Sequence, residues 1–287
     1  MKNYLSLVKF SHTIFAMPFA LVGFITATYG QKDQGLQPLL LVKVVLCMVF
    51  ARSAAMAFNR WLDRDIDARN PRTVIREIPA GVIKADSALL FVLVNCFLFI
   101  LTTWFINPLC FFLSPVALVV ILGYSFTKRF TALCHLVLGL GLSLAPVGAH
   151  LAVTGQFSPA PVLLGAAVLT WVAGFDIIYA LQDEEFDKAH NLFSIPVALG
   201  RNQALRLSEG LHLLSGLFML SSMYLYNSAL ALGWISVTAI SVFLLMLIYQ
   251  HLIIRPGDLS RVNIAFFTTN GIASLIFGVL VIADIVL

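Results

Sequence analysis

The sequence is poor in charged residues. Asp, Glu, Lys and Arg make up 11% of its 287 residues, whereas they supply roughly 25% of an ordinary soluble domain. Hydrophobic residues account for 60% of the chain, and the mean hydropathy is +0.94. This composition excludes a soluble globular protein and a disordered chain. It also excludes a nucleic-acid-binding protein, which needs a continuous basic face.

Cysteine and histidine are scarce as well. The four cysteines fall inside apolar stretches without paired spacing, at Cys47, Cys96, Cys110 and Cys134. We interpret them as packing residues, because neither a disulfide framework nor a zinc site fits this spacing. The six histidines are dispersed and share no ligand spacing, so packing is their favoured role as well.

Long apolar runs fill most of the remaining chain. A helix needs about 20 mostly apolar residues to cross a bilayer. Nine runs meet this requirement, at approximately 10–29, 38–59, 87–106, 109–127, 131–153, 160–182, 207–227, 230–253 and 264–286. We therefore expect an all-α membrane protein that forms one domain over residues 1–287 and crosses the bilayer nine times. The first run is interpreted as a span and not as a cleaved signal peptide, because it is long and eight further spans follow.

The few charges gather in two short segments. Residues 60–86 and 183–209 hold 19 of the 32 charged side chains. Of the 18 basic residues, 16 belong to the amino terminus and to loops on one side of the predicted membrane, and only Lys32 and Lys43 belong to the other side. Because short cytoplasmic loops are enriched in Lys and Arg, we predict that the amino terminus and both charged segments are cytoplasmic and that the carboxyl terminus is outside.

Acidic residues recur at helical spacing in both charged segments. Each step of four residues turns an α-helix by only about 40° beyond a full turn, so such residues share one face. The first set lies at the end of the second span and comprises Asn59, Asp63 and Asp67. The second set lies at the end of the sixth span and comprises Asp176, Asp183 and Asp187, which are spaced seven and four residues apart and also share one face. One acidic residue at a helix end is explained by contact with water, but two such sets on helical registers indicate a site.

The side chains of both sets offer only oxygen atoms as metal ligands, apart from the amide nitrogen of Asn59, and such sets favour Mg²⁺ over zinc. Nearby cations would let such a site accept a diphosphate. Arg52 lies seven residues before Asn59 on the same helical face, inside a span where an unpaired charge is costly. The other candidate cations are Arg69, Arg72, Arg76, Lys128 and Arg129. The general enrichment of basic residues in cytoplasmic loops explains Arg69 and Arg129 equally well.

These residues resemble the UbiA superfamily of intramembrane aromatic prenyltransferases. The motif N-x3-D-x3-D corresponds to Asn59–Asp67, and D-x6-D-x3-D corresponds to Asp176–Asp187. The resemblance covers essentially the whole chain. It includes residues 11–20, the loop 76–81, the ending Tyr124-x3-Lys128-Arg129, the segment Ala145-Pro146-x-Gly148, and Ser194-Ile195-Pro196. One departure is Arg60, which occupies the position after Asn59 where many members carry Asp; because Arg60 is off the acidic face, we expect no effect on metal binding.

The resemblance implies nine helices around a central cavity that opens laterally to lipid, in a bacterial cytoplasmic membrane. It implies a polyprenyl diphosphate donor and an aromatic acid acceptor as ligands, and no obligate protein partner is evident. Two Mg²⁺ ions would be held by Asn59, Asp63, Asp67, Asp183 and Asp187. The diphosphate would contact Arg72, Arg76, Lys128 and Asn59. The acceptor and the reacting carbon would be bordered by Asp176, Arg52 and Tyr124, with Asp176 as the candidate base.

The acceptor itself is left open by the sequence. The chain looks most like the 4-hydroxybenzoate polyprenyltransferase branch of ubiquinone synthesis, but it also resembles a branch that acts on a naphthoate acid in menaquinone synthesis. Both acceptors are aromatic carboxylates, so Arg52 could hold either. A secondary transporter is a distant alternative, because transporters place charged or broken segments near the bilayer midplane, whereas the acidic groups here lie at one membrane face.

Overall fold

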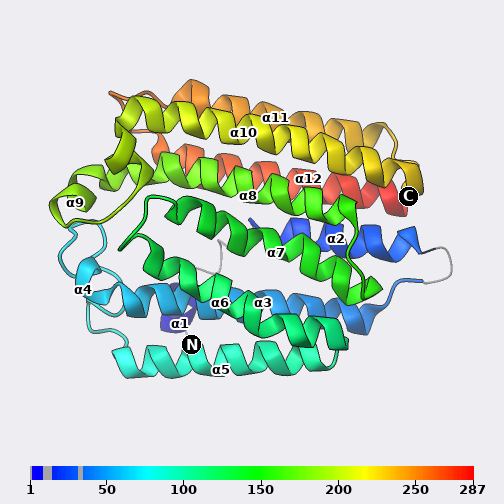
Figure 1. The fold of residues 1–287 in the computed structure, drawn as a ribbon, viewed down its shortest axis with the longest axis horizontal. Coiled ribbons are helices and arrows are strands. Elements are labelled where there is room, and N and C mark those ends of the chain that lie inside the picture. The colour runs from blue at the N-terminus through cyan, green and yellow to red at the C-terminus, as the bar shows by residue number, and fades with distance from the viewer. Residues whose placement is uncertain (1, 9–14, 32–34) are drawn as a thin grey trace.

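The computed structural model describes residues 2–8, 15–31 and 35–287, and these ranges are mostly helical (Figure 1). The helices are α1 (Lys2–Leu7), α2 (Met17–Gly30), α3 (Pro38–Leu62), α4 (Arg64–Asp67), α5 (Ala85–Trp104), α6 (Pro108–Thr127), α7 (Cys134–Thr154), α8 (Pro159–Ala180), α9 (Glu184–Ala189), α10 (Ile195–Leu230), α11 (Trp234–Ile253) and α12 (Asn270–Val286). A 3₁₀ turn, Leu181–Asp183, joins α8 to α9, and a π-helical turn, Ile264–Thr269, leads into α12.

Seven of the described helical segments are long and apolar enough to cross a membrane. They are Pro38–Leu62, Ala85–Trp104, Pro108–Thr127, Cys134–Thr154, Pro159–Ala189, Trp234–Ile253 and Ile264–Val286. The other two predicted spans also coincide with helices. In the first, α2 is apolar but has only 14 residues, and positions 10–14 lie outside the described residues; in the other, α10 is long but more polar. The chain is an integral membrane protein.

Local sequence explains where several helices begin. Proline occupies the first position of α3, α6 and α8, where its missing N–H is not needed and its fixed φ already suits a helix. The side chain of Asn107 caps α6 by accepting a hydrogen bond from the backbone N–H of Cys110 at 2.8 Å. Ser194 caps α10 in the same way through the N–H of Val197.

The long helices lie side by side along the molecule (Figure 1). Helix α3 packs on α5, α6 on α7, α7 on α8, and α8 on α10, while α12 contacts α11 and α2. The largest buried cluster surrounds Trp171 of α8, whose ring centroid lies 5.2 Å from that of Phe19 and 5.6 Å from that of Phe243. Helices α7 and α8 approach closely at Gly139, where a β-carbon would lie 2.3 Å from the carbonyl oxygen of Leu169.

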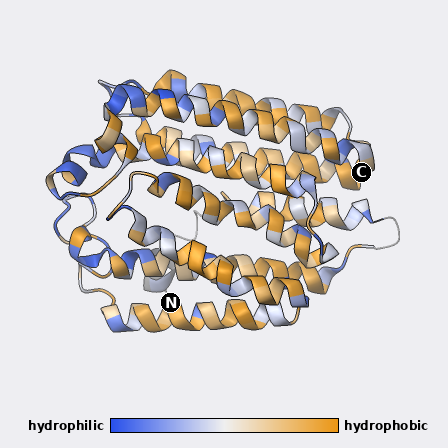
Figure 2. Cartoon of the chain, viewed as in Figure 1, coloured by the Kyte–Doolittle hydropathy of each residue, from blue (hydrophilic) through white to orange (hydrophobic). Residues whose placement is uncertain are grey.

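Polar residues gather at one end of the helices. Figure 2 shows hydrophilic colours concentrated around α4, α9 and their connecting loops, while the long helices are mainly hydrophobic. The two charged segments of the sequence therefore meet at the same end of the molecule, although more than 100 residues separate some of the contacting side chains. This end holds the predicted site.

Candidate active site

The first acidic motif lies on consecutive helical turns, as predicted. The backbone N–H of Asp63 donates to the carbonyl of Asn59 at 2.9 Å, and that of Asp67 donates to the carbonyl of Asp63 at 2.7 Å. The four-residue spacing of backbone hydrogen bonds thus continues across Asp63, although its φ of −90° and ψ of 5° separate α3 from α4. The side-chain amide of Asn59 also donates to Asp63 Oδ2 at 3.2 Å. Three oxygen-bearing side chains therefore share one face at the polar end of α3.

Asp63 is almost completely enclosed and is paired with two cations from the end of α6. Its side chain is 1% exposed; Lys128 Nζ lies 2.9 Å from Oδ2, and Arg129 Nη2 lies 3.1 Å from Oδ1. Arg129 also donates to the carbonyl of Leu62 at 2.8 Å. From the sequence, the general enrichment of basic residues in cytoplasmic loops explained Arg129 equally well. The structure shows that Arg129 contacts the acidic motif directly.

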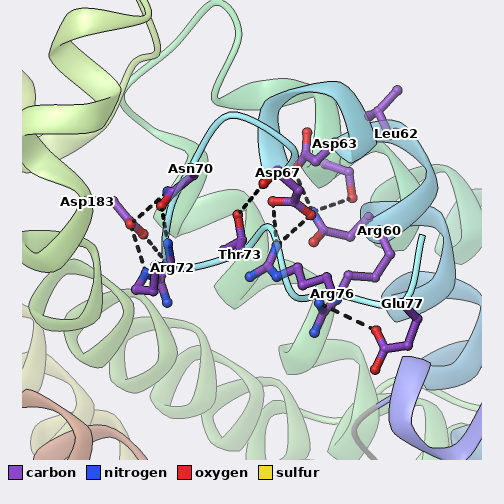
Figure 3. Close-up of polar contacts among 12 residues, drawn as sticks. Arg60, Leu62, Asp63, Asp67, Asn70, Arg72, Thr73, Arg76, Glu77 and Asp183 are labelled. Carbon is purple, nitrogen blue, oxygen red and sulfur yellow. Dashed lines mark hydrogen bonds and ion pairs between the residues drawn. The ribbon is translucent and has the colours of Figure 1, made fainter. Parts of the chain in front are cut away.

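Asp67 is held by the loop that follows it (Figure 3). Arg76 Nη1 donates to both carboxylate oxygens, at 2.7 and 2.8 Å. Thr73 Oγ1 donates to the backbone carbonyl of Asp67 at 3.1 Å. The loop therefore folds back and places a cation against a carboxylate that is only 4% exposed.

The same loop reaches the second acidic motif through Arg72 (Figure 3). Arg72 donates to Asp183 through Nε at 3.0 Å and through Nη2, and Asn70 Nδ2 lies 3.3 Å from the same carboxylate. Arg72 Nη1 donates to the Tyr179 hydroxyl at 2.8 Å, and its guanidinium lies 5.2 Å from the centroid of that ring. Burial by itself would lower the pKa of Arg72, but the hydrogen bonds and charge of Asp183, with Tyr179, raise it above its ordinary value. Arg72 is therefore a firmly charged link between the two motifs.

The second motif departs from a continuous α-helical face. Asp183 is the last residue of the 3₁₀ turn that follows α8. The winding of a 3₁₀ turn is tighter than the 3.6 residues per turn of an α-helix, so the predicted helical spacing does not hold across it. Asp187 lies on α9, where the charges of Asp183 and Lys128 act on it. Asp176 lies on α8, and its Oδ2 is 2.7 Å from Nδ1 of His135. The three carboxylates thus have different partners.

The departure at Arg60 is explained by its surroundings. Its side chain is buried, and Nη1 lies 3.9 Å from Glu77 Oε2. Ser6 of α1 donates to the other oxygen of Glu77 at 2.5 Å. Arg60 therefore contacts the loop that carries Glu77, and no hydrogen bond or ion pair joins it to the acidic motifs among the described residues.

A cavity of about 320 Å³ lies between α3, α5, α6 and α7. Its walls are mainly Leu, Val, Ala, Ile and aromatic side chains, and Arg52 and Tyr124 are among the few polar ones. The Nε atom of Arg52 is buried and has no hydrogen-bond partner among the described residues. A buried cation with a free donor in an apolar cavity fits a ligand that carries an anion on a hydrophobic body.

The donor atoms of the two motifs fit Mg²⁺ by their chemistry. They are carboxylate oxygens and one amide oxygen, which are ligands that Mg²⁺ prefers. Within the described ranges, no three His, Cys, Asp or Glu side chains converge closely enough to hold a metal ion. Asp63, Asp67 and Asp183 instead contact cationic side chains. Metal binding therefore requires these carboxylates to exchange their Lys and Arg partners for the ion.

Four contacts at the site were not assigned from the sequence. Asn70 and Tyr179 support the Arg72–Asp183 pair, Arg129 contacts Asp63, and His135 contacts Asp176. Tyr179 lies within the second acidic motif and Arg129 within the Tyr124-x3-Lys128-Arg129 segment, so the sequence places both residues near the site but does not indicate what they contact. His135 had no sequence signal, because its partner lies 41 residues away on another helix.

Comparison with known proteins identifies the family. Residues 16–272 match the model of the UbiA prenyltransferase family. A 4-hydroxybenzoate octaprenyltransferase of Tolumonas auensis is 30% identical over 238 residues, which cover 81% of this chain and 79% of that protein.

Solved structures show the same fold. The apo structure of a UbiA homolog from Aeropyrum pernix K1 superposes with a TM-score of 0.84 at 31% identity, covering 95% of this chain and 98% of that one. A UbiA homolog from Archaeoglobus fulgidus bound to DMAPP and Mg²⁺ has a TM-score of 0.74 at 21% identity, covering 99% and 100% of the two chains. This chain belongs to the UbiA prenyltransferase family, as its two acidic motifs predicted.

Proposed function

We propose that this aromatic prenyltransferase transfers a polyprenyl group from a polyprenyl diphosphate to 4-hydroxybenzoate in ubiquinone synthesis. One observation carries the proposal: Arg52 lines an apolar cavity, and its buried Nε atom has no hydrogen-bond partner among the described residues. Arg52 lies seven residues before Asn59 on α3, which is about 10 Å along the helix axis. A carboxylate bound at Arg52 would therefore lie close to a diphosphate bound at the acidic motifs.

The diphosphate end of the site would use a Mg²⁺-dependent arrangement. Two Mg²⁺ ions would be held by Asn59, Asp63, Asp67, Asp183 and Asp187. Bound Mg²⁺ supplies positive charge that stabilises the departing diphosphate. The UbiA homolog bound to DMAPP and Mg²⁺ shares the fold and is in keeping with this assignment.

The cations of this chain would then bind the diphosphate oxygens. Arg72, Arg76 and Lys128 now contact Asp183, Asp67 and Asp63, respectively. When those carboxylates bind the metal, the three side chains become free to donate to phosphate oxygens at the same place. Charge placed in advance around the leaving group lowers the barrier to cleavage of the carbon–oxygen bond.

The acceptor would bind beneath the diphosphate. Arg52 donates to the carboxylate of the aromatic acid and so fixes the direction of its ring. Tyr124 borders the reacting carbon, and the apolar walls exclude water that would otherwise react with the allylic cation. The aromatic ring attacks this cation and then loses one proton. We assign the carboxylate of Asp176 as the base that accepts this proton.

The topology belongs to the same proposal. We place α2 and the apolar part of α10 across the bilayer beside the seven qualifying segments, which makes nine crossings. The polar end with α4 and α9 is placed in the cytoplasm, because most basic residues lie there. The carboxyl terminus then lies outside.

A direct assay tests the activity. Purified protein with Mg²⁺ and labelled polyprenyl diphosphate should prenylate 4-hydroxybenzoate, and chelation of the metal should stop the reaction. Asp63→Asn is the matched inactive control. Faster prenylation of a dihydroxynaphthoate than of 4-hydroxybenzoate would instead assign the enzyme to menaquinone synthesis. Movement of label across proteoliposomes without a covalent product would overturn the enzyme assignment in favour of transport.

A further inference from the structure

His135 lies between the candidate base and the start of another helix. It is the second residue of α7, and its side chain is 3% exposed. Nδ1 lies 2.7 Å from Asp176 Oδ2 on α8, and Nε2 lies 3.3 Å from the backbone nitrogen of Ile195, the first residue of α10. One imidazole thus joins three helices at the polar end of the molecule.

The contact with Ile195 defines the protonation of the ring. A backbone N–H can only donate, so Nε2 of His135 accepts this hydrogen bond and carries no proton. The ring is then neutral, with its one proton on Nδ1, and that proton is donated to Asp176. The N–H of Ile195 is available because the first turn of a helix has no internal acceptor for it. Helix α10 therefore selects the tautomer that donates to Asp176.

We propose that His135 is the positioning residue of Asp176. A donated hydrogen bond fixes the rotamer of the carboxylate. The Asp176 side chain is 22% exposed whereas His135 is enclosed, so only the carboxylate can reach a ligand. The inference rests on the proposed function, in which Asp176 accepts a proton.

The proton balance assigns His135 no chemical step. As the donor's carbon–oxygen bond breaks, its electron pair leaves with the diphosphate. An electron pair of the aromatic ring forms the new carbon–carbon bond. The ring proton displaced at that carbon then passes to the Asp176 carboxylate. His135 keeps its Nδ1 proton throughout, so its contribution is orientation of the carboxylate.

Two substitutions separate the hydrogen bonds of His135. In His135→Asn, the amide nitrogen occupies the place of Nδ1, so the donor to Asp176 is retained while the acceptor for Ile195 is lost. In His135→Gln, the amide oxygen can occupy the place of Nε2, so the acceptor for Ile195 is retained while the donor to Asp176 is lost. If His135 positions Asp176, the His135→Asn variant should be more active than His135→Gln. If His135 only joins α7 to α10, His135→Gln should be the more active variant.

We expect His135→Gln to lower kcat about ten- to a hundredfold, the range for loss of one hydrogen bond to a charged group. KM for the polyprenyl diphosphate should stay within about twofold, because His135 does not contact the diphosphate site. His135→Asn should retain most of kcat. In an Asp176→Asn background, His135→Gln should have little further effect, because its partner is already altered.

Three results would overturn the inference: equal activity of the two His135 variants, greater loss in His135→Asn, or additive effects in the double mutant. If His135→Gln does not fold, ¹⁵N NMR of labelled histidine in the unmodified protein reads the tautomer directly, and an Nε2–H ring at His135 would refute the assignment. Failure of the proposed function would look different, because the unmodified protein would then prenylate no aromatic acid.

Discussion

Replacement of Arg52 by methionine tests the cavity assignment, because the structure predicts effects of opposite sign on stability and on activity. Methionine is unbranched and flexible, so it can fill the same space without a charge. An arginine at the centre of a membrane helix costs about 2.5–3.5 kcal/mol on insertion scales. The Nε of Arg52 recovers none of this cost through a hydrogen bond among the described residues. We therefore expect Arg52→Met to stabilise the substrate-free protein by about 1–3 kcal/mol.

The same substitution should weaken acceptor binding selectively. A hydrogen bond to a charged group contributes about 1.5–3 kcal/mol, so KM for the aromatic acid should rise roughly ten- to a hundredfold. KM for the polyprenyl diphosphate should change little, because the diphosphate is assigned to Arg72, Arg76 and Lys128. Arg52→Lys keeps the charge without the planar fork of donors and should fall between the two proteins.

Thermal unfolding in detergent and steady-state kinetics with each substrate varied in turn provide the measurements. A lower unfolding temperature for Arg52→Met would show that Arg52 has a stabilising partner and is structural. A rise in KM for the polyprenyl diphosphate, with the aromatic acid unaffected, would place the diphosphate at Arg52 and refute the assignment of the two substrates.

Further predictions concern the link between the motifs and the packing of the helices. Asp183→Asn should abolish turnover and weaken diphosphate binding, because it removes a metal ligand and the partner of Arg72; unchanged Mg²⁺ dependence of activity would exclude Asp183 from the metal site. Gly139→Ala should destabilise the protein by about 1–3 kcal/mol, because its β-carbon would meet the Leu169 carbonyl. Gly148→Ala on the same helix is the control, since nothing lies within 4 Å of its β-carbon; equal unfolding temperatures for the two variants would contradict the close packing of α7 on α8.

The helices could be predicted because membrane spans leave a simple signal. An apolar run of about 20 residues has few alternatives to a helix in lipid, and each predicted run coincides with a helix over the described residues. The run at 207–227 covers only part of α10, which begins at Ile195. The charged residues at positions 201, 206 and 209 interrupt the hydropathy there, and the helix is kinked at Gly200, where φ is 75° and ψ is 164°.

The site was predictable where its contacts follow from one helix. Asn59, Asp63 and Asp67 could be placed together because the four-residue spacing of backbone hydrogen bonds continues from α3 across Asp63 to Asp67. The second motif could not be treated in the same way, because a 3₁₀ turn at Asp183 leaves no mark in the spacing of its acidic residues. Helical spacing tells which residues share a face, but it does not tell which faces meet.

Contacts between helices therefore required the structure. Arg72 and Asp183 are 111 positions apart, and His135 and Asp176 are 41 positions apart. The general excess of Lys and Arg in cytoplasmic loops also concealed Arg129, since a basic residue at the end of α6 needs no further explanation. Only its contacts with Asp63 and the Leu62 carbonyl distinguish it from such a residue.

The two kinds of cation at the site can be told apart by their effect on stability. Lys128 is paired with Asp63, whose carboxylate is 1% exposed, so Lys128→Met would leave a buried charge with fewer partners and should destabilise the substrate-free protein. The Nε of Arg52 has no partner among the residues that the structure describes, so removal of Arg52 should do the reverse. Both substitutions should reduce activity, one through the diphosphate and the other through the aromatic acid. Lys128 stabilises the substrate-free protein, and the diphosphate must draw it away from the Asp63 carboxylate. Arg52 destabilises the substrate-free protein, because it gains an anionic partner only when the acceptor binds. If both variants lowered the unfolding temperature equally, the cavity would not contain an unpaired charge.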